Sequence, residues 1–225
     1  MSIPKTIYQT FKTSHLPLLT RWHIHRMKKR NPEYDYQFYD DERIDKFIHE
    51  EFDRETYTTY KRIKIGAAKA DFFRYAVLYK RGGIYLDIDS LILCKLDHFI
   101  DPGDSAIISL EGNLKFYIQY ALFFEAGHPF LEKTLAYIFE NIRKNKYPKD
   151  IHKMTGPSVY SRAISDCLKE SKNISYRQIS KDYEDKVKFS YRLSKFFLYG
   201  ISRKNHWKTL SKNTTILEED KNSIN

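Results

Sequence analysis

The stretch from Arg81 to Asp89 constrains this chain most, because it is an apolar strand that ends in two carboxylates. Side chains alternate between the two faces of a strand, so residues two apart share a face. This alternation predicts that Asp87 and Asp89 aim at one point, while Leu86 and Ile88 face a core. Two carboxylates at a strand end suit a hard divalent cation that keeps other positions for water or phosphate oxygens. We therefore expect Mg²⁺ or Mn²⁺ to bind at Asp87 and Asp89.

A helix precedes this strand and carries two more charged side chains. Residues 66–80 have a helical pattern, which Gly82 and Gly83 end. Asp71 and Arg74 are three residues apart, and this spacing places them on one face of the helix. A metal-binding pair, a third acid and an arginine around a glycine turn together suit the binding of a diphosphate.

Together these residues resemble the sugar-binding region of nucleotide-sugar glycosyltransferases that carry a D-x-D motif. Residues 67–89 are most similar to glycosyltransferase family 32, which contains capsular-polysaccharide transferases and yeast-type mannosyltransferases, and are similar to the clostridial glucosylating toxins. D-x-D alone is a weak signal, but its fixed distance from A-D-x-x-R and its coupling to G-G-x-Y make the resemblance specific. Further matches, in order along the chain, are residues 3–12, 31–36, 40–41, 127–130, 155–157 and 206–207.

The resemblance implies a role for each charged residue of the site. Asp71 and Arg74 are expected to bind hydroxyls of the donor sugar, and Arg74 also to hold Asp71 or Asp87 in place. Asp89 is expected to bind the metal directly or through water, and Asp87 to contact the metal or the ribose and sugar hydroxyls. These four residues form the expected catalytic set, and the family implies retention at the anomeric carbon. The plainer alternatives are an acidic strand end that faces water and a salt bridge on a helix surface.

The resemblance also implies residues that bind the nucleotide. Tyr8 stands where similar enzymes have an aromatic residue or His near the base, and Gln9 follows it. Gln119 lies where the family often has Asn near the sugar. The pair His206 and Trp207 resembles a C-terminal element that closes over the metal and diphosphate. The alternatives are that Tyr8 is a core residue and that the His–Trp pair has no role.

Tyr85 lies on the same strand side as Asp87 and Asp89. It is expected to pack beside the nucleotide, or to be a core tyrosine.

Strands and helices alternate along the chain, which indicates an α/β sheet with helices on both faces. Ligands in such folds bind beyond the carboxyl ends of the strands. The resemblance implies the GT-A fold, with a mixed central sheet flanked by helices. We expect one domain over residues 1–213 and a polar, disordered tail over residues 214–225. Residues 116–125 fit a strand, although a buried helix is an alternative.

The composition indicates a globular chain with a positive surface. Thirty-nine Lys and Arg against 29 Asp and Glu give a net charge of +10. This charge is either a solvated surface or an attraction to a nucleotide diphosphate, a lipid pyrophosphate or an anionic membrane leaflet. The apolar runs are too short to span a bilayer, and the chain begins without a signal-peptide pattern, so we expect a cytoplasmic protein.

Residues 188–199 interleave cations with aromatic side chains, a pattern typical of peripheral membrane association. The alternative is that Phe196, Phe197 and Leu198 belong to the core.

The function predicted from the sequence is metal-dependent glycosyl transfer. The donor would be a nucleotide diphosphate sugar, with UDP favoured over GDP, and the acceptor a polysaccharide or a lipid-linked glycan. One alternative is a nucleic-acid-binding protein or a metal nuclease, but the basic residues are scattered and a two-metal nuclease needs more acids. Another is an inactive sugar-nucleotide-binding protein that acts as an assembly partner.

Overall fold

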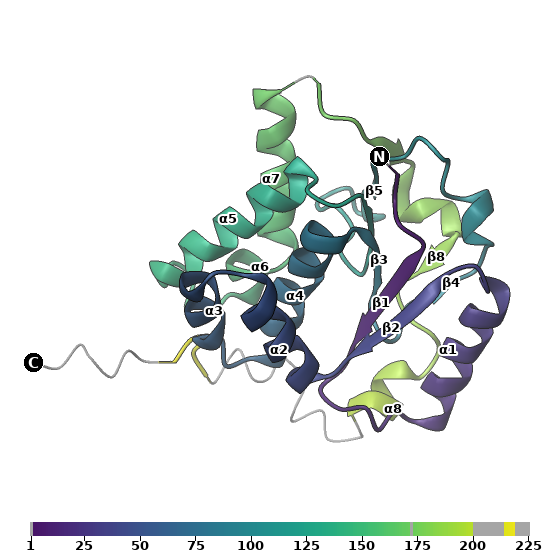
Figure 1. Ribbon diagram of the computed structural model, residues 1–225, viewed down its shortest axis with the longest axis horizontal. Coiled ribbons are helices and arrows are strands. Elements are labelled where there is room, and N and C mark those ends of the chain that lie inside the picture. The colour runs from purple at the N-terminus through teal and green to yellow at the C-terminus, as the bar shows by residue number, and fades with distance from the viewer. Residues whose placement is uncertain (1, 172, 200–213, 219–225) are drawn as a thin grey trace, which may run out of the picture.

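A mixed sheet of six strands forms the centre of the molecule (Figure 1). The computed structural model describes residues 2–171, 173–199 and 214–218. The strands, in spatial order, are β2 (Asp35–Tyr39), β1 (Thr6–Thr10), β3 (Gly83–Leu86), β6 (Ala121–Phe124), β5 (Ala106–Ser109) and β7 (Arg177–Ile179). The strands β2, β1 and β3 are parallel, whereas β6 is antiparallel to both of its neighbours and β7 is parallel to β5. The carboxyl ends of β1, β2 and β3 therefore meet at one edge of the sheet.

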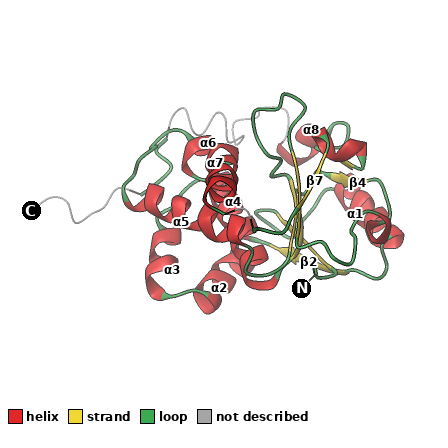
Figure 2. Cartoon of the chain, turned by 90° about the horizontal axis from the view of Figure 1, so that it is seen from above, coloured by secondary structure: helices red, strands yellow, loops and turns green. Residues whose placement is uncertain are grey.

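Helices cover both faces of the sheet, as the sequence predicts (Figure 2). One side holds α2 (Asp41–Glu51), α3 (Arg54–Lys61), α4 (Gly66–Arg81), α5 (Pro129–Arg143), α6 (Ile151–Met154) and α7 (Pro157–Glu170). The other side holds α1 (Leu18–Arg30), α8 (Ser194–Tyr199) and a small antiparallel pair, β4 (Leu91–Ile92) with β8 (Val187–Lys188). Short 3₁₀ turns lie at Leu96–His98 and Lys181–Asp185. No helix of the described segments has the length and apolar character needed to cross a membrane.

The strand β3 is buried on both faces, which gives the protein two hydrophobic cores. Tyr85 belongs to the core beneath α4, and Ile84 and Leu86 belong to the core on the opposite face. The middle of α4, from Asp71 to Leu78, is buried, with Phe73 and Leu78 fully inaccessible. Apolar burial at this scale, at about 25 cal/mol per Å² removed from water, is the main stabilisation of the fold. It also holds the end of β3 rigidly.

Two sequence expectations need correction or completion here. Residues 116–125 contain the strand β6, so the buried-helix alternative is wrong. The prediction of a disordered tail is wrong for residues 214–218, because Ile216 and Leu217 are buried. The backbone N–H of Ile216 donates to the carbonyl of Pro148, and Leu217 forms a β-bridge with Ile63. Two apolar side chains within a polar sequence are enough to attach this segment to the core.

The turn between α4 and β3 needs glycine at both positions. Gly82 has φ of 63° and Gly83 has φ of 108°, a region that other residues rarely adopt. A Cβ on Gly83 would lie 2.7 Å from the carbonyl oxygen of Thr6, and a Cβ on Gly82 would lie 2.7 Å from the amide nitrogen of Ala126. The Gly–Gly pair thus lets β3 enter the sheet directly beside β1.

We expect Gly83→Ala to lower the free energy of unfolding by about 2–4 kcal/mol, because it combines backbone strain with a steric clash. Urea denaturation followed by circular dichroism measures this change. Gly103→Ala is the matched control, since a Cβ there meets nothing within 4 Å. A Gly83→Ala protein as stable as the Gly103→Ala protein would contradict this account of the turn.

Candidate active site

A cleft of about 510 Å³ opens at the edge of the sheet where the three parallel strands end. Its lining includes Phe11 and Lys12 after β1, Asp41 after β2, and Asp87 and Asp89 after β3. The cleft therefore lies beyond the carboxyl ends of the strands, where the sequence predicts ligand binding. The helix α4 adds Asp71 and Arg74 to the same cleft.

The two aspartates of the D-x-D motif lie in a turn that follows β3, because the strand ends at Leu86. The backbone N–H of Ser90 donates to the carbonyl of Asp87 over 2.9 Å and closes this turn. The Nε2 of Gln9 donates to the same carbonyl over 3.1 Å. Strand alternation, from which we predicted the convergence of the pair, is therefore not its cause; a hydrogen-bonded turn brings Asp87 and Asp89 together.

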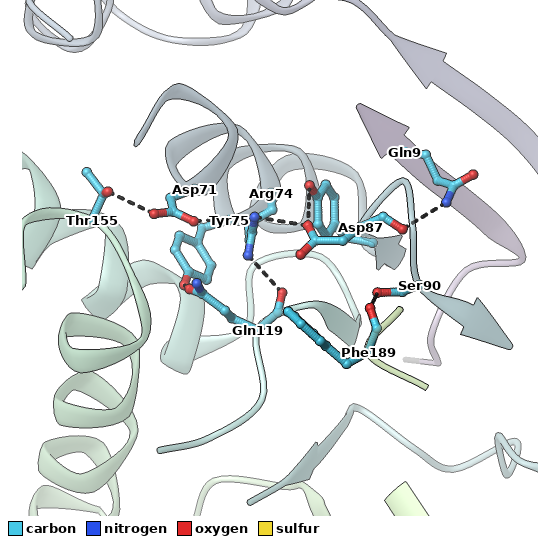
Figure 3. Close-up of polar contacts among 10 residues, drawn as sticks. Gln9, Asp71, Arg74, Tyr75, Asp87, Ser90, Gln119, Thr155 and Phe189 are labelled. Atoms are coloured by element: carbon cyan, nitrogen blue, oxygen red, sulfur yellow. Dashed lines mark hydrogen bonds and ion pairs between the residues drawn. The ribbon is translucent and has the colours of Figure 1, made fainter. Parts of the chain in front are cut away.

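Arg74 joins two of the carboxylates (Figure 3). Its Nη2 lies 3.0 Å from Oδ1 of Asp87 and 3.3 Å from Oδ1 of Asp71. Its Nη1 donates to the backbone carbonyl of Gln119 over 3.0 Å. The guanidinium also lies over the ring of Tyr85, 4.9 Å from its centroid. The alternative of a salt bridge on the helix surface is wrong, because the side chains of Arg74 and Asp71 are each only 6% exposed.

Asp71 is held on both of its oxygens. Oδ2 accepts a hydrogen bond of 2.9 Å from Oγ1 of Thr155, and Oδ1 faces Arg74. Burial raises the pKa of Asp71 to about 6, although Arg74 and Thr155 both act to lower it. Thr155 is fully buried at the end of α6, so it fixes the position of Asp71 from below the cleft.

The D-x-D carboxylates also have raised pKa values. Burial and the neighbouring charge of Asp87 raise the pKa of Asp89 to about 6, against a hydrogen bond of 3.0 Å from Oγ of Ser194. Burial raises the pKa of Asp87, while Arg74 and the hydroxyl of Tyr85 lower it. Three carboxylates and one guanidinium line this part of the cleft, so its centre has an excess of negative charge that a cation would relieve.

The donor set fits a divalent cation of the Mg²⁺ or Mn²⁺ type. Arg74 and Tyr85 both bind Oδ1 of Asp87, and Ser194 binds Oδ2 of Asp89, so one oxygen of each carboxylate lies away from these donors. Within the described parts of the chain, no three His, Cys, Asp or Glu side chains gather into a larger ligand group. Magnesium is commonly held by one or two carboxylates together with substrate phosphates, and two carboxylates match that pattern.

The structure places some of the predicted nucleotide-binding residues at or beside the cleft and one of them in the core. Tyr85 lines the cleft and donates from its hydroxyl to Asp87 over 3.0 Å. Gln119 receives a hydrogen bond of 2.7 Å from Tyr75 on its side chain, and Gln9 supports the turn at Asp87. Tyr8 is a core residue, 3% exposed and absent from the cleft lining, and burial raises its pKa to about 12. The expected roles of His206 and Trp207 fall outside the described residues.

Several cleft residues were not predicted from the sequence. Lys195 and Phe189 line the cleft from the C-terminal part of the described chain, and Lys12 and His152 line it from elsewhere. Lys12 lies in residues 3–12, and Phe189 and Lys195 lie in residues 188–199, but neither pattern indicates that these side chains reach the site. Only the proximity in space of segments far apart in sequence assigns them to the site.

Residues 20–107 match the family described as the glycosyltransferase sugar-binding region containing a DXD motif. An uncharacterised glycosyltransferase of Acanthamoeba polyphaga mimivirus is 29% identical over 174 residues, which cover 75% of this chain and 67% of that protein. Inositol phosphoceramide mannosyltransferase 3 of Schizosaccharomyces pombe is 37% identical over 58% of this chain and 35% of that protein. The initiation-specific alpha-1,6-mannosyltransferase of Candida albicans is 24% identical over 73% of this chain and 53% of that protein. The chain thus spans about half or less of these two mannosyltransferases.

Solved structures share the fold. The PaToxG glycosyltransferase superposes with a TM-score of 0.60 at 16% identity, over 96% of this chain and 90% of that chain. The UDP-bound glycosyltransferase domain of the YGT toxin superposes with a TM-score of 0.55 at 10% identity, over 79% of this chain and 80% of that chain. These likenesses confirm the predicted GT-A fold. In its sugar-binding region, over residues 20–107, and in its fold, the chain is therefore similar to glycosyltransferases that carry a DXD motif.

Proposed function

We propose that this protein transfers a hexose or an N-acetylhexosamine from a nucleotide diphosphate sugar to a polysaccharide or lipid-linked glycan, with Mn²⁺ or Mg²⁺ and with retention at the anomeric carbon. One observation carries the proposal: Asp71, Arg74, Asp87 and Asp89 meet in a single cleft at the carboxyl ends of parallel strands. The predicted cytoplasmic location stays a prediction.

Each residue of the constellation has a task in this reaction. The bond between the anomeric carbon and the diphosphate breaks, and the departing diphosphate gains negative charge. A divalent cation at Asp87 and Asp89 would supply the positive charge that stabilises this leaving group. Arg74 holds Asp87 in one orientation, and Asp71, fixed by Thr155, is the proposed acceptor of hydrogen bonds from the sugar hydroxyls. Lys195 and Lys12 add positive charge at the cleft wall, where phosphates would approach.

The names of the relatives bear on the choice of donor. Two of them are mannosyltransferases, so mannose joins the hexoses to be tested. A thermal-shift panel of UDP-sugars and GDP-sugars with Mn²⁺, beside single-stranded DNA, tests the function, because a ligand that binds the folded state raises Tm. A rise with one sugar nucleotide followed by product formation supports the proposal. A rise only with DNA would favour the nucleic-acid alternative, and binding without turnover would favour the inactive sugar-nucleotide binder.

Replacing either carboxylate of the D-x-D motif should abolish metal-dependent transfer. We expect Asp87→Asn and Asp89→Asn to lower kcat/KM by at least about a hundredfold, since each would remove a carboxylate ligand of the proposed cation. Initial rates with and without Mn²⁺, and calorimetric binding of the nucleoside diphosphate, measure the loss. Asp185→Asn, an exposed acid outside the cleft, is the control. Full activity in EDTA, or in the double Asn variant, would rule out the proposed metal site.

Arg74 should affect turnover more than nucleotide binding. We expect Arg74→Ala and Arg74→Lys to reduce kcat by at least about a hundredfold, because an ammonium group cannot reproduce the planar fork that contacts Asp71, Asp87 and the Gln119 carbonyl together. The Kd of the free nucleoside diphosphate should change little. Arg81→Lys, at a surface ion pair with Glu51, is the matched control. Circular dichroism confirms folding, and normal turnover of the Lys variant would reduce Arg74 to a structural role.

Thr155 should control the ionisation of Asp71. The hydroxyl of Thr155 lowers the pKa of Asp71, so Thr155→Val removes a bond that favours the carboxylate and raises that pKa. We expect the acid limb of the kcat profile to move to higher pH by about one unit, the equivalent of one charge-assisted hydrogen bond. Thr155→Ser keeps the donor and should keep the parent profile. Identical profiles for the Val and Ser variants would show that Thr155 does not act through Asp71.

A further inference from the structure

The net positive charge of this protein comes from two segments. Residues 1–32 contain seven Lys and Arg and no Asp or Glu, and residues 186–217 contain eight and none. The rest of the chain has 24 Lys and Arg against 29 Asp and Glu, which leaves it at −5. The whole excess of +10 therefore arises from these two segments, which lie at opposite ends of the sequence.

The described parts of the two segments pack against each other. Tyr191 joins them, because its hydroxyl lies 2.6 Å from Oγ1 of Thr20 and its ring stacks on His23 at 4.4 Å between centroids. Both Thr20 and His23 belong to α1. Figures 1 and 2 show α1 and α8 on the same side of the sheet, close together. The helix α1 and residues 191–198 thus adjoin, and we call the region that they form the α1–α8 surface.

Large apolar side chains are exposed on this surface. On α1, Leu18 is 79% exposed and Trp22 is 49% exposed, one helical turn apart. Beside and on α8, Leu193 is 61% exposed, Phe196 51% and Phe197 42%. The alternative that Phe196, Phe197 and Leu198 belong to the core is therefore confirmed for Leu198, which is buried, and wrong for the two phenylalanines. Exposed apolar groups of this size gathered in one place mark an interaction site.

Cations surround these apolar groups. The exposed basic side chains of α1 and of residues 191–198 include Arg21, Arg26, Arg192 and Lys195. The guanidinium of Arg26 lies 4.7 Å from the centroid of the Trp22 ring. Apolar side chains with a basic border, on two segments that have no acidic residue in their own sequence, match an anionic lipid surface. A nucleic acid would use the cations and could stack on the aromatic rings, but it would leave Leu18 and Leu193 without a partner.

We propose that the α1–α8 surface docks onto the headgroup layer of an anionic membrane. Trp22, Leu193 and Phe196 would enter the boundary between headgroups and acyl chains, while Arg21 and Arg192 pair with lipid phosphates. The surface adjoins the cleft, because Lys195 of α8 lines it and Ser194 binds Asp89. Docking would therefore place the cleft beside lipid-linked molecules. This inference goes beyond the proposed function and needs no donor or acceptor.

Vesicle sedimentation with the full chain tests the proposal. The vesicles are phosphatidylcholine alone, or phosphatidylcholine with about one quarter phosphatidylglycerol, at low and high salt. We expect salt-sensitive binding to the anionic vesicles alone. Arg21→Gln with Arg192→Gln should weaken it about 25-fold, at about fivefold per cation. Trp22→Ser with Phe196→Ser should weaken it at both salt concentrations, since it removes apolar contacts. All four side chains are exposed, so folding should be retained.

The control replaces an exposed apolar and basic pair elsewhere. Leu114→Ser with Lys115→Gln lies in the β5–β6 connection and should bind vesicles as the parent does. Equal loss in this control, equal binding to neutral vesicles, or no binding under any condition would overturn the proposal. Binding of single-stranded DNA that the Arg variant loses, without vesicle binding, would assign the surface to nucleic acid instead. Because vesicle binding is measured without donor or acceptor, its failure would leave the proposed transfer reaction untouched.

Discussion

The buried contact of Arg74 with Asp71 and Asp87 is the interaction on which the site depends. Placing these charges in a protein interior is costly, and removal of one partner from a buried ion pair typically costs about 3–5 kcal/mol. The fold can tolerate the free-energy cost of these buried charges because α4 and β3 are held together. The Gly82–Gly83 turn joins the two elements, and their apolar side chains fill both cores. The carboxylates are therefore positioned before any ligand arrives, and the geometry needs little reorganisation on binding.

A consequence of this arrangement is an uneven distribution of charge. The centre of the cleft has three carboxylates against one arginine, and burial raises the pKa values of all three acids. This local field attracts a divalent cation and would repel a diphosphate that came without one. Positive side chains remain at the cleft wall, in Lys12 and Lys195, where they can meet phosphate oxygens without neutralising the metal-binding pair.

The sequence predicted the local elements well, because their signals are local. The helix over residues 66–80, the strand that follows and the glycine turn each have a periodicity or a stop signal, and the spacing of Asp71 and Arg74 placed both on the buried face. Tyr8 was ambiguous, since a tyrosine near a strand end packs in a core or against a ligand with the same pattern. Contacts such as Thr155 with Asp71 and Ser194 with Asp89 join residues 84 and 105 positions apart. Periodicity carries no information about such distant pairs.

The two ends of the described chain explain how one small protein can hold an acidic site and a basic surface together. Opposite fields separated by more than a Debye length of about 8 Å are largely screened from each other at physiological salt. The helix α1 lies on the opposite side of the sheet from α4, and the pKa values of Asp71 and Asp87 depend on burial, on Arg74 and on neighbouring hydroxyl groups rather than on the cations of α1. Lys195 belongs to both regions: it lines the cleft, and it lowers the pKa of Asp89. The boundary between the two fields therefore runs along α8, whose first residue, Ser194, binds the metal-binding turn and whose phenylalanines face solvent.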